Sequence, residues 1–329
     1  MKCFVTGATG FIGNRLIEIL VDKGHDVNIL VRNRNFSNRN PKIKVFQGDL
    51  FDAAVLTKAI EGCDVVFHMA AYANLWSKDK TLAFRTNVTG TENVLKAALK
   101  NKVSKVVFTS SAGTLAPSET LEKVDETFPV PKEYFTEYET TKRQAEELCI
   151  EYVRKGLNVV IVNPSRVYGP GHLNKSNSVT ILIKKYVEGK WRIIPGGGGQ
   201  IGNYVFVDDV VSGHILAFEK GKPGEKYILG GDNVSYTELF RFLAEVTGKK
   251  YKMFHLPMSL MMGVGKVEFF LAENFGKKPL ITPPWVKRYQ QNRLLSIQKA
   301  QRELEYSPIS LKEGIEKTIS WLKETSYGK

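Results

Sequence analysis

Three glycines spaced three residues apart separate an apolar stretch from a helical pattern at the start of the chain. Residues Lys2–Thr6 have the short, largely apolar character of a buried strand, and Arg15–Lys23 has helical periodicity. Gly7 permits a tight turn, Gly10 lets the backbone approach a ligand, and Gly13 lets the helix pack closely on the strand. The chain therefore begins with a strand, a turn and a helix, which restricts the folds open to it.

The helix N-terminus after this turn is a candidate anion site. Its first N–H groups have no partner within the helix, and the helix dipole is positive there. In this context the glycine spacing predicts a site for the pyrophosphate of a dinucleotide, while a plain turn without a ligand is the alternative. The residues expected to bind the cofactor here are Gly7, Thr9, Gly10, Phe11, Ile12 and Gly13.

Short apolar runs and helical patterns alternate through the first half of the chain. Expected strands cover Asp26–Val31, Lys44–Gln47, Val65–His68, Lys105–Ser110 and Asn158–Asn163, and expected helices cover Ala53–Ile60, Asn87–Lys100 and Thr136–Arg154. Alternation with continuously apolar strands indicates a parallel sheet covered on both faces. The predicted fold class is α/β, a doubly wound Rossmann sheet that binds ligands at the carboxyl ends of its strands.

The pattern loosens after Pro164, where glycine-rich loops interrupt it. Tyr204–Val207 and Tyr227–Leu229 look like strands that return to the main sheet, with a helix over Asp208–Phe218 between them. We expect a cofactor domain of residues 1–165 plus 204–230. A smaller, mostly helical substrate domain would take residues 166–203 plus 231–329.

The net charge is unusual for a chain of ordinary composition. The 329 residues include 47 basic and 34 acidic side chains, a formal charge of +13. Residues 1–165 carry a net +3 and residues 166–329 a net +10, so the excess lies in the second half. Nucleic acid, an anionic membrane, an acidic ligand or a solvated surface could each explain this excess. The basic residues are interleaved with acidic ones, which favours a solvated surface, and we expect no nucleic-acid partner.

The most apolar segment of the second half is too interrupted to span a membrane. Between Met253 and Phe275 the chain has one proline and three charged residues: Pro257, Lys266, Glu268 and Glu273. Its methionines could line a flexible pocket or form a helix core. Lysines flank it at Lys249, Lys250, Lys252, Lys277 and Lys278, so a weak peripheral membrane contact is a further possibility.

The cysteines point to neither disulfides nor a metal. Cys3, Cys63 and Cys149 are far apart, odd in number and without a metal-ligand spacing. No secretory signal precedes the first expected strand. We expect reduced, buried thiols, no metal site and a cytoplasmic location.

The end of the second expected strand bears on the choice of cofactor. An acidic residue there would bind the adenosine ribose and favour NAD, but the chain has Leu30-Val31-Arg32-Asn33-Arg34. Arg32 can reach a 2′-phosphate, so NADP(H) is favoured and NAD(H) remains possible. After the third strand, Asp49 and Leu50 are expected beside the adenine, although Asp49 could instead be a helix N-cap.

A tyrosine and a lysine four residues apart suggest proton-transfer chemistry. Tyr138 and Lys142 emerge from the same face of an expected helix. A nearby ammonium would lower the pKa of the phenol, which could then exchange a proton with a carbonyl or alcohol oxygen. Ser110 and Ser111 end the Lys105–Ser110 strand, and we expect Ser111 to bind the substrate oxygen. The alternative is that these serines cap the next segment.

Taken together, these motifs resemble the extended short-chain dehydrogenase/reductase superfamily, the NAD-dependent epimerase/dehydratase family. The resemblance extends over residues 1 to about 232. It rests on Gly7-x-x-Gly10-x-x-Gly13, Asp49, His68-Met69-Ala70-Ala71, Asn87-Val88-x-Gly90-Thr91, Ser110-Ser111, Tyr138-x-x-x-Lys142, the run Asn163 to Gly171, and Val207-Asp208-Asp209-Val210.

The resemblance implies a role for each matching position. Tyr138 is the general acid/base, Lys142 tunes it and holds the ribose, and Ser111 orients the substrate oxygen. Asn87 buttresses the active-site helix. Ala70 and Ala71 lie along the cofactor, Pro164 and Ser165 flank the nicotinamide, and Val167 lies near the substrate.

Further features of the sequence bear on which branch of the family the chain resembles. The Val31-Arg32 strand end resembles the dihydroflavonol-reductase-like branch. Tyr72 and Trp76 would place aromatic rings near the substrate, although Trp76 could equally pack under a loop. The stretch Gln200–Asn203 lacks the arginine with which many nucleotide-sugar enzymes bind a diphosphate, and no carboxylate follows Ser111 within Ala112–Ala116.

The favoured function is therefore NADPH-dependent reduction of a ketone or aldehyde group on a small, largely apolar substrate. A sugar or nucleotide-sugar epimerase or dehydratase is the alternative within the family. A non-catalytic NADP-binding or nucleic-acid-binding protein is the alternative of another class. A homodimer through the expected helices Asn87–Lys100 and Tyr138–Arg154 is possible.

Overall fold

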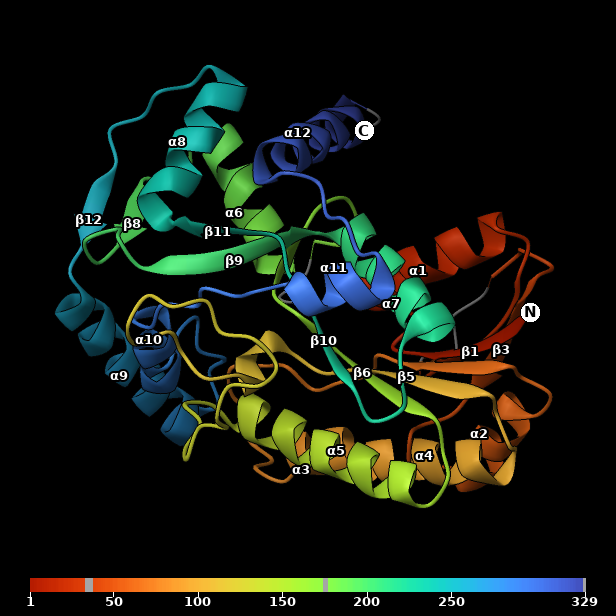
Figure 1. The fold of residues 1–329 in the computed structure, drawn as a ribbon. Helices are drawn as coiled ribbons and strands as arrows, with labels where there is room; N and C mark the ends of the chain where they lie inside the picture. Colours follow the sequence, from red (N-terminus) through yellow and green to blue (C-terminus); the bar gives the residue numbers. More distant parts are fainter. Residues whose placement is uncertain (33–37, 174–176, 328–329) are drawn as a thin grey trace.

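A computed structural model describes residues 1–32, 38–173 and 177–327 of the chain. In these residues, parallel strands form a seven-stranded sheet in the order β10-β6-β5-β4-β1-β2-β3 (Figure 1). The strand order reverses between β1 and β4, which opens a crevice at their carboxyl ends. The strands are β1 (Lys2–Thr6), β2 (Asp26–Val31), β3 (Ile43–Gln47), β4 (Val65–His68), β5 (Lys105–Thr109), β6 (Val159–Pro164) and β10 (Lys226–Leu229).

Helices cover both faces of this sheet and confirm the predicted doubly wound class. One face carries α1 (Phe11–Asp22), α7 (Val207–Lys220) and α11 (Gln298–Leu304); the other carries α2 (Ala53–Ile60), α4 (Gly90–Lys100) and α5 (Glu137–Arg154) (Figure 1). Side chains of a strand alternate between the faces. Cys3 and Val5 join the core under α1, whereas Phe4 joins the core under α2 and α4.

A smaller sheet lies beside the main one. Strand β9 (Ile201–Phe206) pairs with β7 (Arg166–Tyr168) in parallel and with β11 (Asp232–Ser235) in antiparallel orientation. Three helices pack around it: α6 (Ser178–Val187), α8 (Tyr236–Thr247) and α12 (Leu311–Tyr327) (Figure 1). A further parallel pair consists of β8 (Ile193–Pro195) and β12 (Phe254–Leu256).

One predicted strand belongs to this smaller sheet. Tyr227–Leu229 joins the main sheet as part of β10, as expected, but Tyr204–Val207 does not, because β9 pairs only with β7 and β11. An apolar run indicates a strand without showing which edge it will pair with. The division into a cofactor domain and a substrate domain remains a proposal. Because β9 pairs with β7 and β11, we would now assign β9 to the substrate domain and not to the cofactor domain.

Two further regions complete the described part of the chain. A short helix α3 (Leu82–Phe84) and a π-helical turn η1 (Arg85–Thr89) lead into α4, so the predicted helix Asn87–Lys100 begins earlier and less regularly than expected. After β5 comes a 3₁₀ turn, η2 (Ala112–Thr114), and near the C-terminus come α9 (Met258–Phe275) and α10 (Pro283–Tyr289). No helix in the described residues has the length and apolar character needed to cross a membrane.

Candidate active site

The glycine turn between β1 and α1 has the tight geometry that its spacing predicts. Gly7 has a φ of +73°, and a Cβ added there would lie 2.7 Å from the Ala70 nitrogen. A Cβ added to Gly13 would lie 2.2 Å from the Gly7 carbonyl oxygen. Helix α1 begins after Gly10 without a side-chain cap and without an acidic residue in its first turn. Its N-terminus therefore has the features of an anion site.

The other turn residues surround this helix start. Thr9 is exposed, Ile12 is partly exposed and Phe11 is buried. A Cβ added to Gly171 would lie 3.0 Å from the Phe11 ring, so the loop after β7 passes directly over the beginning of α1. The turn is thus enclosed from one side by protein and open on the side of Thr9.

A buried histidine fixes the loop that faces the glycine turn. His68 lies between Thr6 and Thr91, with its ring nitrogens 2.6 Å and 2.9 Å from their hydroxyls. Burial lowers the pKa of His68 to about 3, so the ring is neutral. The Met69 and Ala70 N–H groups both donate to the Thr6 hydroxyl, at 3.2 Å each. This network holds Ala70, and with it the exposed Ala71, at the carboxyl end of β4.

The predicted adenosine-binding residues follow β2 and β3. Arg32 is exposed directly after β2, and Arg34 lies outside the described residues. Asp49 is partly exposed and Leu50 is buried. The alternative that Asp49 caps α2 is wrong, because the cap is Asp52, which accepts a hydrogen bond from the Val55 N–H at 3.0 Å. The Asp49 carboxylate is therefore left for another partner.

Tyr138 lies in the first turn of α5, whose start is fixed by a capping box of Thr136 and Glu139. The Ser111 side chain lies near enough to the Tyr138 hydroxyl to lower the pKa of the phenol. One turn later, the buried Lys142 donates from Nζ to the Thr109 carbonyl at 2.6 Å and lies 4.7 Å from the centre of the Phe108 ring. The structure thus brings Ser111, Tyr138 and Lys142 together at the carboxyl end of β5.

The two serines have different partners. The buried Ser110 hydroxyl donates to Glu146 at 2.6 Å, which is a structural contact between β5 and α5. The Ser111 oxygen accepts the Gly113 N–H at 3.0 Å and so caps η2. The capping alternative is confirmed for Ser111. Its expected role of binding the substrate oxygen is compatible with this position and stays a prediction.

Charge effects on Tyr138 differ from the sequence-based expectation. Burial raises its pKa above the ordinary value, while the nearby Ser111 side chain and the Arg288 guanidinium oppose that rise. The expected lowering by Lys142 is not seen, since burial dominates and the Lys142 ammonium is bonded to the Thr109 carbonyl. Burial also lowers the pKa of Lys142 to about 8. At neutral pH Tyr138 is a protonated acid.

Asn87 connects the loop after β4 with α5. It is fully buried in η1, where its Nδ2 donates to the Thr141 hydroxyl at 2.9 Å and to the Tyr72 carbonyl at 3.0 Å. Its oxygen accepts the Tyr72 N–H at 2.7 Å. These bonds fit the buttressing role implied by the resemblance, because Thr141 directly precedes Lys142.

The aromatic residues of this loop extend toward α9. The Tyr72 hydroxyl donates to the Trp76 carbonyl at 3.2 Å, and the Trp76 indole N–H donates to Glu273 of α9. Lys80 also pairs with Glu273 and lies 5.2 Å from the Trp76 ring centre. Trp76 thus bridges the loop and α9, which is the packing role that the sequence left open.

The end of β6 contains an unpaired polar atom. Ser165, which follows Pro164, donates its N–H to the Leu229 carbonyl at 3.2 Å. Its Oγ is buried and has no hydrogen-bond partner among the described residues. Such an atom fits a ligand that supplies the missing bond. Val167 packs against the core under α1 and α7, and its expected place near the substrate stays a prediction.

A cluster of arginines was missed by the sequence analysis. The buried Glu139 accepts from Arg288 at 2.8 Å and from Arg293 at 3.4 Å, and Arg293 also donates to the Leu115 carbonyl at 2.7 Å. The capping spacing of Thr136 and Glu139 was visible in the sequence, but nothing local in residues 288–293 indicated partners 150 residues away.

Arg166 is a third missed arginine. Its guanidinium donates to the hydroxyls of Tyr204 at 2.9 Å and Tyr236 at 3.3 Å, and the described residues offer it no carboxylate. A Cβ added to Gly202 would lie 2.4 Å from its Nη1. The position in β9 where an arginine seemed to be missing is therefore filled by a guanidinium from β7.

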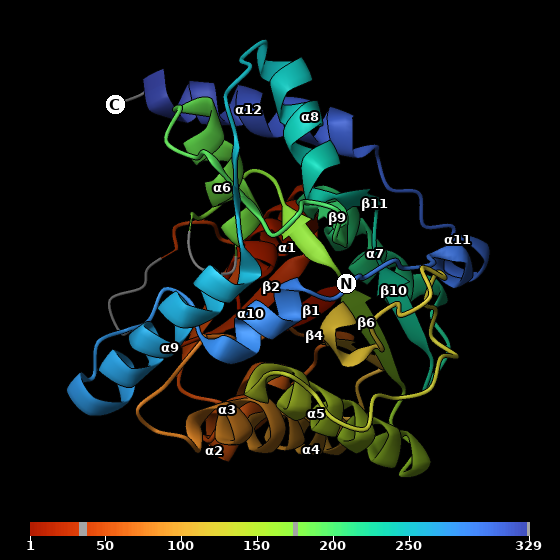
Figure 2. The same cartoon turned by 90° about the vertical axis from the view of Figure 1, so that its left-hand side faces the viewer.

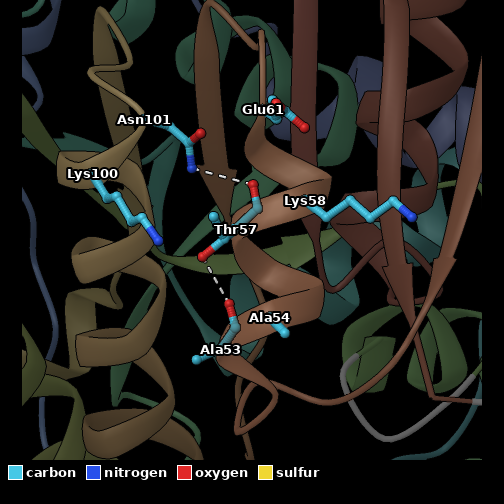
Figure 3. A pocket seen from close by; sticks show the side chains of 7 residues that line it. All are labelled: Ala53, Ala54, Thr57, Lys58, Glu61, Lys100 and Asn101. Atoms are coloured by element: carbon cyan, nitrogen blue, oxygen red, sulfur yellow. Dashed lines mark hydrogen bonds between the residues drawn. The ribbon is translucent and has the colours of Figure 1, made fainter.

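The more obvious surface hollows lie elsewhere. A hollow of about 550 Å³ between α2 and α4 is lined by Ala53, Ala54, Thr57, Lys58, Glu61, Lys100 and Asn101, none of which was predicted as a site residue (Figure 3). A second, of about 320 Å³, lies beside the start of α5 and is lined by Glu133, Tyr134, Phe135, Pro283, Pro284 and Lys287. Neither hollow is lined by Ser111 or Tyr138, so we place the candidate active site at these two residues and not in the hollows.

Comparisons with known proteins agree with this geometry. The model of the NAD dependent epimerase/dehydratase family matches residues 3–230. A Synechocystis sp. protein named for dihydroflavonol 4-reductase is 31% identical, over 99% of this chain and 96% of its own. Sterol demethylase protein B of Methylococcus capsulatus is 30% identical, over 98% and 99%. The crystal structure of gox2253 is 34% identical with a TM-score of 0.82, covering 98% of both chains. The chain therefore belongs to the NAD-dependent epimerase/dehydratase family, enzymes of the extended short-chain dehydrogenase/reductase superfamily.

Proposed function

We propose that the protein is an NADPH-dependent reductase of a ketone or aldehyde group on a small, largely apolar substrate. The observation that carries this proposal is the position of Ser111, directly after β5, and of Tyr138, in the first turn of α5, with the buried Lys142 one turn later bonded to the Thr109 carbonyl at the end of β5. A protonated phenol and a serine hydroxyl can both donate to one carbonyl oxygen. Bound NADPH supplies the hydride, and Tyr138 supplies the proton.

The residues around the crevice fit a nicotinamide dinucleotide. The close contacts at Gly7 and Gly13 leave the α1 N-terminus open for a pyrophosphate. The Asp49 carboxylate has no bonded partner among the described residues and would bind the adenine. The Ser165 hydroxyl, unpaired in the same part of the chain, would bind near the nicotinamide. Arg32 is exposed and has no carboxylate partner in the described residues, which supports a role on a 2′-phosphate. We therefore favour NADPH over NADH.

The names of relatives support an apolar, ring-containing substrate. The family matches include a protein named for dihydroflavonol 4-reductase and a sterol demethylase protein B, both aligned over nearly the whole chain. We extend to this chain only the common feature of their names, a fused-ring compound. The absence of a carboxylate in Ala112–Ala116 after Ser111 agrees with simple carbonyl reduction.

A second candidate, an epimerase or dehydratase of a nucleotide-sugar, gains support from one observation. The sequence argued against it because Gln200–Asn203 contains no arginine. Arg166 nevertheless places a guanidinium against Gly202, without a carboxylate partner in the described chain. That cation could bind an anionic group of a substrate, whether a diphosphate or a carboxylate.

A substrate panel tests the proposal and separates the candidates. Ring ketones, aldehydes and nucleotide-sugars are each incubated with NADPH or NADH, and both cofactor oxidation and sugar products are measured. Tyr138→Phe should lower reduction by about 10²–10⁴-fold while NADPH binding changes little, because only the proton donor is lost. Ser111→Ala should lower it by about 10²-fold.

Tyr152→Phe is the matched control for this test. Tyr152 is a buried tyrosine on the same helix, three turns beyond Lys142, and should keep wild-type turnover. Normal turnover in Tyr138→Phe would exclude the assignment. Conversion of a nucleotide-sugar without net NADPH consumption would favour the second candidate.

The thiols support the proposed cytoplasmic location. Cys3, Cys63 and Cys149 are all buried and free, and burial raises the pKa of Cys3 to about 12 and of Cys63 to about 11. Such thiols are poorly reactive. A homodimer through α4 and α5 also remains a proposal, which size-exclusion chromatography with light scattering would test.

A further inference from the structure

Helix α9 exposes apolar side chains on the face that it does not use for packing. Its packed face contains Met261, Gly265 and Ala272, which are buried. The exposed apolar stripe consists of Leu260, Val264, Val267, Phe270 and Phe275, spaced three to five residues apart along the helix. Phe270 is 60% exposed and Phe275 is 73% exposed, although a phenylalanine is normally buried. A single such residue would need no explanation, but a continuous stripe does.

Exposed apolar residues continue the stripe beyond both ends of the helix. Phe254 in β12, just before α9, is 56% exposed, and Leu280, just after it, is 85% exposed. The rings of Phe270 and Phe275 lie 6.5 Å apart in an edge-to-face arrangement, so the last turn presents one joint aromatic surface. In Figure 2 α9 lies beside α10 at the outer edge of the molecule.

Lysines flank α9 on both sides in the sequence. Lys249, Lys250 and Lys252 precede the helix, and Lys277 and Lys278 follow it; all are exposed. Among the described residues, no carboxylate forms an ion pair with any of these five lysines. Lys277 and Lys278 directly follow the last turn of α9, where Phe270 and Phe275 are exposed, whereas Lys249 bonds the Val187 carbonyl at the end of α6, on the far side of β12.

The two carboxylates of α9 do not counter these charges. Glu268 accepts the Leu280 N–H at 3.1 Å, and Glu273 pairs with Lys80 and with the Trp76 indole. Both acidic side chains are therefore engaged by protein groups. The exposed side of α9 thus combines apolar groups with the ammonium groups of Lys266 within the helix and of Lys277 and Lys278 directly after it.

We infer that α9 is an interfacial helix that binds the surface of an anionic lipid bilayer. An apolar helix face bounded by lysines is complementary to acyl chains beneath a layer of negative headgroups. The aromatic turn at Phe270 and Phe275 would enter the acyl boundary, and the flanking lysines would contact the headgroups. Neither part requires a helix that crosses the bilayer.

The contact with the bilayer would lie close to the substrate loop. Glu273 of α9 holds Trp76 and Lys80, and Tyr72 of the same loop is bonded to Asn87 beside Lys142. A lipid-bound enzyme would thus present this loop near the surface in which apolar compounds dissolve. The membrane inference does not depend on the proposed reductase activity, and its test uses the protein without substrate.

Co-sedimentation with vesicles tests the inference. The full chain is mixed with vesicles of phosphatidylcholine containing phosphatidylglycerol, or of phosphatidylcholine alone, at low and at physiological salt. We expect binding to the anionic vesicles, at least about tenfold weaker binding to phosphatidylcholine alone, and weakening by salt. No binding to the anionic vesicles at low salt overturns the inference.

Matched variants separate the apolar and charged contributions. Val267→Ser with Phe270→Ser and Phe275→Ser should reduce binding at least about tenfold, whereas Val130→Ser, at an exposed valine outside α9, should not. Lys277→Glu with Lys278→Glu should reduce binding to anionic vesicles about tenfold or more. The control for charge is Lys58→Glu with Lys100→Glu, which lie in the α2–α4 hollow (Figure 3).

Other outcomes argue against the bilayer as the partner. Unchanged vesicle binding in the α9 triple variant overturns the inference. So does a wild-type dimer that dissociates in this variant while vesicles bind neither protein, because a second copy would then cover the stripe. Thermal unfolding of each variant shows whether it is folded, and these surface changes should shift stability little.

Discussion

At the residue scale, the environment of Tyr138 decides which form of the phenol is present. Sequence spacing indicated a cation nearby, and we expected Lys142 to act directly on the phenol. In the structure, burial raises the tyrosine pKa, and the cation that opposes this is Arg288. Lys142 is itself nearly desolvated, with a pKa lowered to about 8. Under the proposed function, Tyr138 would therefore act as a proton donor.

Arg32 carries the first prediction at this scale. Arg32→Ala should weaken NADPH binding by about 10–100-fold, the loss expected for a hydrogen bond to a charged group, and should leave NADH binding nearly unchanged. Fluorescence titration with each cofactor measures both constants. Arg39→Ala is the control, since Arg39 is another exposed arginine of the same connection. Equal loss for both cofactors would refute a role on the 2′-phosphate.

At the scale of elements, the close packing of α1 against β1 requires residues without side chains, Gly7 and Gly13, at their contact. Helix α1 can begin where it does because Gly13 approaches the Gly7 carbonyl and Gly7 approaches the loop after β4. This same closeness keeps the helix N-terminus uncovered. Packing and the proposed pyrophosphate site thus rest on the same atoms.

Gly13→Ala tests this element. The added methyl group would meet a backbone oxygen at 2.2 Å, so α1 must shift away from β1. We expect a loss of roughly 1–3 kcal/mol in the free energy of unfolding. NADPH binding should weaken by tenfold or more, because the helix N-terminus moves. Urea denaturation and cofactor titration measure the two effects.

Gly197→Ala is the control for that substitution. A Cβ added to Gly197 meets nothing within 4 Å, and its backbone is not in the left-handed region. Stability and cofactor affinity should stay near the wild-type values. If Gly13→Ala changes neither the free energy of unfolding nor the affinity for NADPH, the backbone around Gly13 accommodates the added methyl group and the prediction is wrong.

At the scale of the whole molecule, Glu139 connects distant parts of the chain. It belongs to the capping box of α5, and it also accepts from Arg288 and Arg293, which come from the C-terminal segment. The carboxylate is fully buried, while the side chains of Arg288 and Arg293 are 24% and 10% exposed. Removing its charge would leave two guanidinium groups without a close counter-charge.

Glu139→Gln should therefore destabilise the protein by roughly 3 kcal/mol, somewhat less than for a pair buried on both sides. Urea denaturation measures this change. Glu147→Gln removes an exposed partner of Arg143 on the same helix and should cost at most about 1 kcal/mol. Equal effects of the two substitutions would show that Glu139 acts only as a helix cap.

The charge of +13 also belongs to the whole molecule. The sequence favoured a solvated surface and left a membrane contact open as the lesser possibility. The structure adds that Lys277 and Lys278 directly follow an exposed apolar stripe on α9. This arrangement assigns part of the excess charge to a proposed bilayer contact, while the absence of a nucleic-acid partner stays a prediction.

The sequence alone determined the local elements and most of the cofactor half. Lys2–Thr6, Asp26–Val31, Ala53–Ile60 and Val65–His68 have the bounds that were predicted. Period, caps and glycines are local properties, so the order of strands and helices and the Tyr138–Lys142 spacing follow from neighbours in the chain.

Only the tertiary structure decided which distant groups meet. It placed β9 in a second sheet, packed Val167 against the core and made Asp52, not Asp49, the cap of α2. It also brought Arg166 over Gly202 and the C-terminal arginines to Glu139. Pairing between segments far apart depends on the shape and charge of the surfaces that meet. Those surfaces exist only once the chain has folded, and no local pattern encodes them.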